Sequence, residues 1–172
     1  MPTSTPGAAK SSFPAVTDAA TRVLILGSLP GEASLRAGQY YAHPQNQFWR
    51  LMGVVMGREL HALAYLERLD ALGSVGVGLW DTVRSAERVG SLDAQIRGPI
   101  PNSLSEFAAT LPRLRTVAFN GAKASTIGRG QLADSDFTLI TLPSSSPAHA
   151  VPFERKAEQW IRLKAFLAGA SD

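Results

Sequence analysis

Apolar residues along the chain fall into short continuous runs separated by stretches with a helical period. The runs predict buried strands, and they cover Val23–Leu26, Val75–Trp80, Thr116–Phe119 and Phe137–Leu142. The intervening stretches predict helices, which begin near Gln47, cover Leu60–Leu72 and Ser103–Leu111, lie within Ala122–Leu132, and follow Pro152. Strand–helix alternation is typical of α/β folds. We therefore expect a three-layer α/β/α sandwich around a central, mainly parallel four-stranded sheet.

The same pattern divides the chain into two parts. Residues 1–20 are rich in Ala, Ser, Thr and Pro and have no clear period, which predicts a flexible tail that is ordered only near Phe13 and Val16. Residues 21–172 contain no repeats and are enough for one domain with a hydrophobic core. The Ser103–Glu106 segment has the capping-box pattern of a helix start.

Composition excludes several classes of site. The chain has no cysteine, so disulfides and thiolate-bound metals are excluded. His43, His61 and His149 are far apart, so we expect no metal site and no cofactor. No G-x-S-x-G motif is present, which argues against a serine hydrolase.

The charge of the chain permits a polyanionic partner. The net charge is +3 and the pI is about 9.6, which is compatible with nucleic acid but does not require it. No apolar run is long enough to span a bilayer, and no secretory signal is visible. A cytoplasmic protein without a membrane partner is expected.

Four loops follow the predicted strands. Ligands of open α/β sheets bind outside the carboxyl ends of the strands, which directs attention to the sequences GSLPGEAS, DTV, NGAKA and PSSSPAHA. Gly27–Gly31 opens the first loop, and its glycines allow tight turns and a close approach of ligand to backbone. This segment matches neither the P-loop nor the dinucleotide fingerprint, so alone it also fits a plain turn.

The segment Tyr40–Trp49 carries more specific information. Aromatic rings, a histidine and side-chain amides are crowded into a turn before a helix. Phe48 and Trp49 begin an apolar helical face and are predicted to be core. Tyr41 can stack on a base, and Asn46 can orient a water or ligand without ionising.

Together the two segments resemble a known family. The pattern G-x-x-P-G, followed by aromatic-Ala-His-Pro-x-Asn-x-Phe-Trp, is similar to mismatch-specific uracil-DNA glycosylases. The versions GSLPGEASL and YYAHPQNQFW resemble more closely the hypoxanthine-DNA glycosylase branch of that superfamily. The resemblance covers about residues 22–165. It implies the uracil-DNA glycosylase fold and a monofunctional enzyme that flips a deaminated base, hypoxanthine first, out of DNA and cleaves its N-glycosidic bond with water.

The resemblance also implies roles for residues of the first two segments. Other branches place a water-positioning Asp or Asn in the first loop, where this chain has Leu29. The hypoxanthine branch implies Asn46 for that task. Tyr41 matches the aromatic that stacks on the extruded base, and backbone groups of Gly27 and Ser28 are expected beside it.

Asp81 follows the second strand, at the place where other branches have a base-reading asparagine. A carboxylate here can accept the ring N–H of hypoxanthine or uracil. A helix N-cap is the alternative role for this residue.

The loop Leu142–His149 resembles the second motif of the family, which enters the DNA minor groove. DNA contacts are expected from Ser144, Ser145, Ser146 and His149. Ser144 occupies a position that is often His or Asn elsewhere, whereas His149 lies later and has a solvated turn as its alternative.

Contacts outside this loop are less specific. Lys123 is expected to face a phosphate, and Asn120 to serve as a turn or helix cap. Arg155 and Lys156 suit either the DNA backbone or a solvated helix face.

Two other functions remain open at this point. Uracil, including uracil in G·U pairs, is an alternative substrate, and a non-catalytic nucleic-acid-binding module is an alternative class. No lysine stands where a Schiff-base nucleophile is expected, so no strand-cleaving step is predicted. We expect a monomer that acts on double- or single-stranded DNA.

Overall fold

A four-stranded parallel sheet forms the centre of the computed structural model, which describes residues 9–169. Strand β2 (Val23–Gly27) lies between β3 (Val77–Asp81) and β6 (Thr116–Asn120), and β7 (Thr138–Leu142) pairs with β6. The order is β3-β2-β6-β7, and every pairing is parallel. The carboxyl ends of all four strands therefore meet at one edge.

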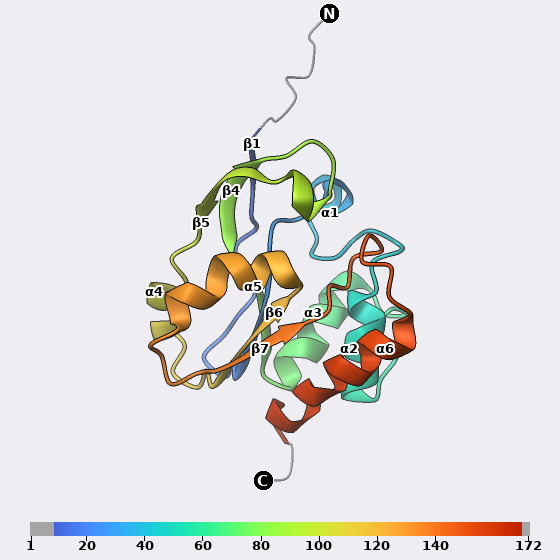
Figure 1. The fold of residues 1–172 in the computed structure, drawn as a ribbon. Helices are drawn as coiled ribbons and strands as arrows, with labels where there is room; N and C mark the ends of the chain where they lie inside the picture. Colours follow the sequence, from blue (N-terminus) through green and yellow to red (C-terminus); the bar gives the residue numbers. More distant parts are fainter. Residues whose placement is uncertain (1–8, 170–172) are drawn as a thin grey trace, which may run out of the picture.

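Helices cover both faces of this sheet (Figure 1). One face packs against α2 (Phe48–Met56), α3 (Tyr65–Ser74) and α6 (Phe153–Trp160), which continues as a 3₁₀ segment over Ile161–Phe166. The other face packs against α4 (Leu104–Ala109) and α5 (Ala122–Gly128), which is followed by a 3₁₀ turn over Arg129–Leu132. The predicted three-layer sandwich is confirmed.

Strand β2 explains why its apolar run is continuous. Val23 and Ile25 pack into the core beneath α2, α3 and α6, whereas Leu24 and Leu26 pack into the core beneath α4 and α5. A central parallel strand is buried on both faces, so successive side chains are all apolar instead of alternating with polar ones. The Gly27 that ends the run is also the first residue of the site edge.

A second, antiparallel sheet was not predicted. It has the order β1-β4-β5, formed by β1 (Ala9–Ser11), β4 (Val83–Glu87) and β5 (Arg97–Pro101). A single residue, Thr82, separates β3 from β4, and the register of the β4–β5 pair is interrupted by bulges. The β4–β5 connection contains a 3₁₀ turn over Asp93–Gln95 and lies beside the short helix α1 (Glu32–Ala37).

Part of the predicted tail lies against the domain instead of extending from it. Residues 1–8 are outside the described residues, but Ala9–Ser11 pairs with β4, and Val16 forms a β-bridge with Leu79. The Tyr40 hydroxyl donates to the Pro14 carbonyl at 3.1 Å. Backbone pairing and this side-chain bond hold a segment whose composition alone indicated flexibility.

The helix starts also differ from the sequence pattern in two places. Ser103 precedes α4, but its side chain makes no capping hydrogen bond. Instead the Leu104 N–H donates to Oε1 of Gln131 at 2.9 Å, so a residue distant in sequence satisfies the helix start. The helix predicted from Leu60 begins only at Tyr65.

Candidate functional site

A cavity of about 820 Å³ opens at the carboxyl ends of the parallel strands. It is lined by every residue that the sequence singled out for the site, namely Gly27, Ser28, Leu29, Tyr41, Asn46, Asp81, Lys123, Ser144, Ser145, Ser146 and His149. These residues come from segments that are far apart in the sequence. They meet because β2, β3, β6 and β7 end at the same edge of the sheet.

Asp81 and Tyr41 place two unpartnered polar atoms at the inner end of this cavity. The Oδ2 of Asp81 and the hydroxyl of Tyr41 are buried and have no hydrogen-bond partner. A Cβ atom on Gly27 would stand 2.8 Å from Asp81 Oδ1 and 3.2 Å from the Tyr41 hydroxyl. Buried polar groups are almost always satisfied in proteins, so this pair indicates a place where a polar ligand binds.

Burial also sets the protonation of these groups. The pKa of Asp81 is raised to about 7, mainly by burial and in part by the nearby charge of Asp93, while the charge of Arg88 opposes the shift. Burial likewise raises the pKa of Tyr41, so its hydroxyl stays protonated. Asp81 is therefore present in both its charged and its neutral form near neutral pH.

The backbone of Tyr41 is held in an unusual conformation. Its φ is +54°, and Tyr41 is the one non-glycine residue of the described chain with positive φ. Such strain is concentrated at functional sites, where the surrounding structure must hold it. Here the Tyr41 ring stacks on Phe48 with centroids 3.9 Å apart and an angle of 16° between the planes.

Asn46 lies half-buried on the cavity wall, just before α2. Its Oδ1 accepts a hydrogen bond from the Phe48 N–H at 3.0 Å, and its backbone N–H donates to the His43 carbonyl at 2.9 Å. Within residues 9–169, no protein group accepts from its Nδ2. The Oδ1 of Asn46 thus accepts from the first N–H of α2, and its Nδ2, unpaired within the described chain, remains free to donate a hydrogen bond.

Hydrogen bonds with residues outside it anchor the loop after β7 to the domain. Asn120 bonds both the backbone N–H and the Oγ of Ser145 at 2.9 Å, and the Gln47 N–H donates to the Ser145 carbonyl at 2.9 Å. Trp160 Nε1 donates to the carbonyl of Pro143 at 2.9 Å. Ser145 is buried and its hydroxyl is engaged within the protein, in contrast to the predicted DNA contact.

Lys156 also differs from its predicted surroundings. It was assigned to a DNA-facing or solvated helix face, but its side chain is buried and Nζ donates to the Ser146 carbonyl at 3.1 Å. Burial lowers the pKa of this ammonium group. Its neighbour Arg155 is exposed.

The connection between β4 and β5 supplies a wall of the cavity that the sequence did not reveal. Asp93 accepts a hydrogen bond from the Ser28 hydroxyl, and both residues line the cavity. The buried guanidinium of Arg88 donates to the carbonyls of Leu29, Pro30 and Gly90. Single charged residues in a loop of ordinary composition carry no sequence signal for this role.

Leu29 contacts both the cavity and the second sheet. Its side chain is buried in a small cluster with Val83, Ala86 and Ile96. Although Leu29 lines the cavity, it packs beneath β4, which accounts for an apolar residue at a position that is polar in other branches.

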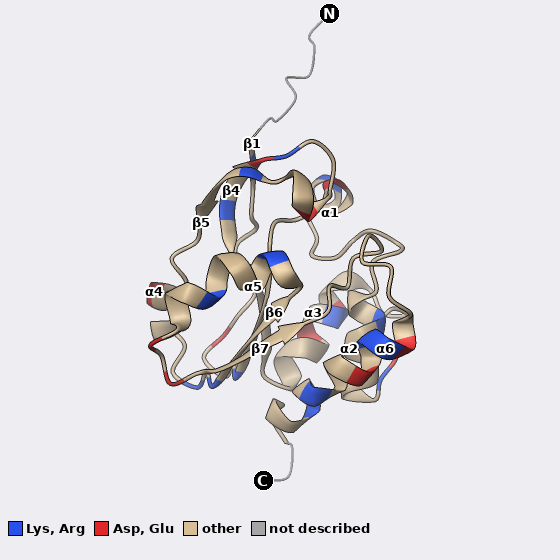
Figure 2. Ribbon diagram, viewed as in Figure 1, with Lys and Arg blue, Asp and Glu red and all other residues tan. Residues whose placement is uncertain are grey.

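Charged residues are distributed over several elements, including β4, α5 and α6 (Figure 2). Lys123 lies half-buried in the first turn of α5, and His149 is exposed on the loop after β7.

In the part of the chain that is described, no three His, Asp or Glu side chains are arranged to hold a metal ion. None of the described helices is long and apolar enough to cross a membrane.

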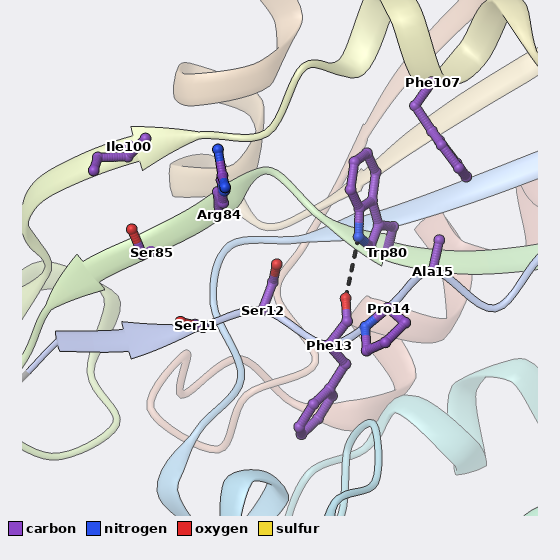
Figure 3. A pocket seen from close by; sticks show the side chains of 10 residues that line it. All are labelled: Ser11, Ser12, Phe13, Pro14, Ala15, Trp80, Arg84, Ser85, Ile100 and Phe107. Atoms are coloured by element: carbon purple, nitrogen blue, oxygen red, sulfur yellow. Dashed lines mark hydrogen bonds between the residues drawn. The ribbon is translucent and has the colours of Figure 1, made fainter.

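A second cavity, of about 750 Å³, lies where β1 and β4 approach α4 (Figure 3). Trp80 and Phe107 form its aromatic wall, and Trp80 Nε1 donates to the Phe13 carbonyl at 3.1 Å. None of the predicted site residues lines it.

Comparisons with known proteins identify the family of the chain. Residues 14–167 match the family model of the uracil DNA glycosylase superfamily. The chain is 44% identical over 151 residues to the hypoxanthine DNA glycosylase of Methanosarcina barkeri (strain Fusaro / DSM 804), and 39% identical over 151 residues to that of Methanosarcina acetivorans. Each match covers 88% of this chain and 95% of the relative.

A solved structure shows the same fold. The solution NMR structure of a protein from M. acetivorans, described as a candidate uracil DNA glycosylase, superposes with a TM-score of 0.82 at 38% identity. The match covers 91% of this chain and 96% of that one. The chain therefore belongs to the uracil DNA glycosylase superfamily.

Proposed function

We propose that this protein removes hypoxanthine from DNA by hydrolysing its N-glycosidic bond. The observation that carries the proposal is the pair of buried, unpartnered polar atoms on Asp81 and Tyr41, in a cavity that Asn46 also lines. Relatives named hypoxanthine DNA glycosylases, which match 88% of the chain, support the choice of base.

The extruded base would lie between Tyr41 and Asp81. The Tyr41 ring is backed by Phe48 on one face and lines the cavity, so we expect its other face to stack on the purine. The ionised carboxylate of Asp81 accepts the N1–H of hypoxanthine. Gly27 leaves the space that both side chains need.

Asn46 would position the attacking water. Cleavage passes through a cationic sugar, and this reaction depends on a placed water and on preorganised polar groups more than on a strong base. The bond from Phe48 N–H to Asn46 Oδ1 fixes the side chain, so its amide stands in one orientation. The base leaves as an anion with the electrons of the glycosidic bond, the water oxygen bonds to C1′ of the sugar, and the proton that the water loses passes through solvent to the departed base.

The rim of the cavity would hold the DNA. Lys123 suits a phosphate, whereas Ser144, Ser146 and His149 lie on the loop after β7 and suit the minor groove. The proposal includes a monomeric, cytoplasmic enzyme that acts on duplex or single-stranded DNA without a cofactor. It also includes the absence of a lyase step, so strands should break only after treatment with alkali.

The test is a single-turnover assay on matched oligonucleotides that carry inosine, uracil, xanthine or undamaged bases. We expect rapid release of hypoxanthine, and a rate lower by roughly 10²–10³-fold in Asn46→Ala. Gln45→Ala is the matched control, because Gln45 is exposed and its side chain makes no hydrogen bond among the described residues.

Three results would contradict parts of the proposal. Faster release of uracil than of hypoxanthine would make uracil the substrate. Lesion binding without release of any base would favour a binding module. A wild-type rate in Asn46→Ala, with melting temperature unchanged, would remove Asn46 from the mechanism.

A further inference from the structure

The hydrogen bond between Ser28 and Asp93 lies within the wall of the proposed base site. The Ser28 hydroxyl donates to Asp93 Oδ1, and both residues line the cavity. Ser28 directly follows Gly27, which pairs with Asp81 across the sheet. The hydroxyl therefore belongs to the same end of the cavity as the carboxylate proposed to read the base.

The position of Asp93 is fixed by hydrogen bonds before it in the chain and by a buried side chain after it. The Gly90 carbonyl accepts from Lys10 Nζ at 2.7 Å and from Arg88 Nε at 2.9 Å. On the other side the Ile96 side chain is buried. Asp93 is thus presented to Ser28 by a braced segment.

The backbone of Ser28 is equally constrained. Its carbonyl accepts from the Val83 N–H at 3.0 Å, and the Gly27 carbonyl accepts from the Thr82 N–H at 2.7 Å. Ser28 is 7% exposed, so bulk water offers little competition for its hydroxyl. The bond to Asp93 therefore determines where the single hydroxyl hydrogen points.

A serine hydroxyl has one hydrogen and two lone pairs. Because Asp93 takes the hydrogen, Ser28 can only accept hydrogen bonds from a molecule in the cavity. Deamination of adenine converts N1 from a lone-pair acceptor into an N–H donor. An accepting Ser28 hydroxyl beside Asp81 therefore favours hypoxanthine and leaves the N1 of adenine facing a second acceptor.

We infer that Asp93 is a positioning residue that makes the site reject adenine, by holding the Ser28 hydroxyl as an acceptor beside Asp81. This inference rests on the proposed function. It assigns to the β4–β5 connection a part in distinguishing a damaged base from its undamaged parent. Without Asp93 the hydroxyl can turn its hydrogen into the cavity and donate to the N1 of adenine.

The experiment compares release of hypoxanthine and adenine from otherwise identical duplexes, each base opposite thymine, at about pH 8, where Asp81 is mainly ionised. Single-turnover rates give the ratio of hypoxanthine to adenine release. We expect this ratio to fall by roughly tenfold or more in Asp93→Ala, because the penalty against a mispaired polar group is lost. Adding Asp93→Ala to Ser28→Ala should change the ratio no further.

Ser91→Ala is the matched control. It removes the bond that Ser91 accepts from Glu32 in the same segment but leaves the Ser28–Asp93 bond in place. We expect its hypoxanthine-to-adenine ratio to equal that of the wild type. Melting temperatures of all variants separate loss of fold from loss of selectivity.

The outcomes distinguish this inference from the proposed function. If the wild type releases no hypoxanthine, the proposed function fails. If it does, but Asp93→Ala lowers both rates equally or leaves adenine release undetectable, the bond merely joins two loops and the inference alone is overturned. An equal fall of the ratio in Ser91→Ala would also overturn it.

Discussion

Asn120, the last residue of β6, makes two hydrogen bonds to Ser145 on the loop that follows β7. Its Oδ1 accepts from the Ser145 N–H and its Nδ2 donates to the Ser145 hydroxyl, both at 2.9 Å. Both residues are buried, so neither bond has water as a ready substitute. The Asn120 side chain thereby fixes the position of the loop of residues 144–149 relative to the cavity.

Loss of this amide should destabilise the protein. In Asn120→Ala the Ser145 N–H and hydroxyl lose their partner inside the protein, and we expect the free energy of unfolding to fall by about 2 kcal/mol or more. Urea denaturation measures the change. Ser145→Ala is the comparison, because it loses one of the two bonds and should show a smaller fall. Equal effects in the two variants would contradict this account.

Asp81 should lower the stability of the protein as pH rises. Burial raises its pKa from 3.8 to about 7, so between these values the folded protein binds a proton that the unfolded chain has released. The free energy of unfolding therefore falls as pH rises through that window and stays low above it. We expect Asp81→Asn to be more stable than the wild type at about pH 8, by about 1–4 kcal/mol, with little difference near pH ~4.

Urea denaturation at the two pH values checks this expectation. A stability difference that is the same at both would show that the carboxyl group is ionised throughout the window. The variant should meanwhile release hypoxanthine more slowly than the wild type at about pH 8, because an amide oxygen is a weaker acceptor of the ring N–H than a carboxylate.

Gly27 should tolerate no side chain. In Gly27→Ala the added Cβ would stand 2.8 Å from Asp81 Oδ1, closer than non-bonded atoms approach, so Asp81 or the strand end must move. We expect a loss of about 1–3 kcal/mol in unfolding free energy and a sharp fall in hypoxanthine release. Gly130→Ala is the matched control, because no atom lies within 4 Å of its added Cβ. Wild-type activity in Gly27→Ala would argue against a base bound beside Asp81.

The sheet and the location of the site could be predicted from the sequence for a physical reason. Val23–Leu26 is apolar throughout because β2 is buried on both faces, and parallel strands bring their carboxyl ends to one edge. Once those strands were recognised, Asp81, Asn120 and Ser144 had to lie at the same edge of the sheet. They are far apart in the sequence, but the parallel arrangement of the strands brings them to one cavity.

Other features have no local pattern. All residues of β5 are exposed and two are prolines, so its pairing with β4 leaves no apolar alternation to detect. Lys156 and Arg88 are of residue types that usually lie on the surface. Their side chains are buried here because they donate hydrogen bonds to backbone carbonyls at distant positions. Asp93 takes part in the site through its hydrogen bond with Ser28, which is 65 residues away in the sequence. Such roles depend on tertiary contacts and cannot be derived from neighbouring residues.

Lys123 should contribute to DNA affinity without recognising the base. It lies in the first turn of α5 on the cavity wall, and the structure places no carboxylate within 4 Å of its ammonium among the described residues. If it binds a phosphate, Lys123→Ala should weaken binding to lesion and undamaged DNA alike and reduce the slope of log affinity against log salt by about 1. Fluorescence anisotropy over a salt series measures both quantities. Arg113→Ala is the matched control, because Arg113 is exposed before β6, at the opposite edge of the sheet. An unchanged slope in Lys123→Ala, or an equal change in Arg113→Ala, would place the phosphate contact elsewhere on the rim.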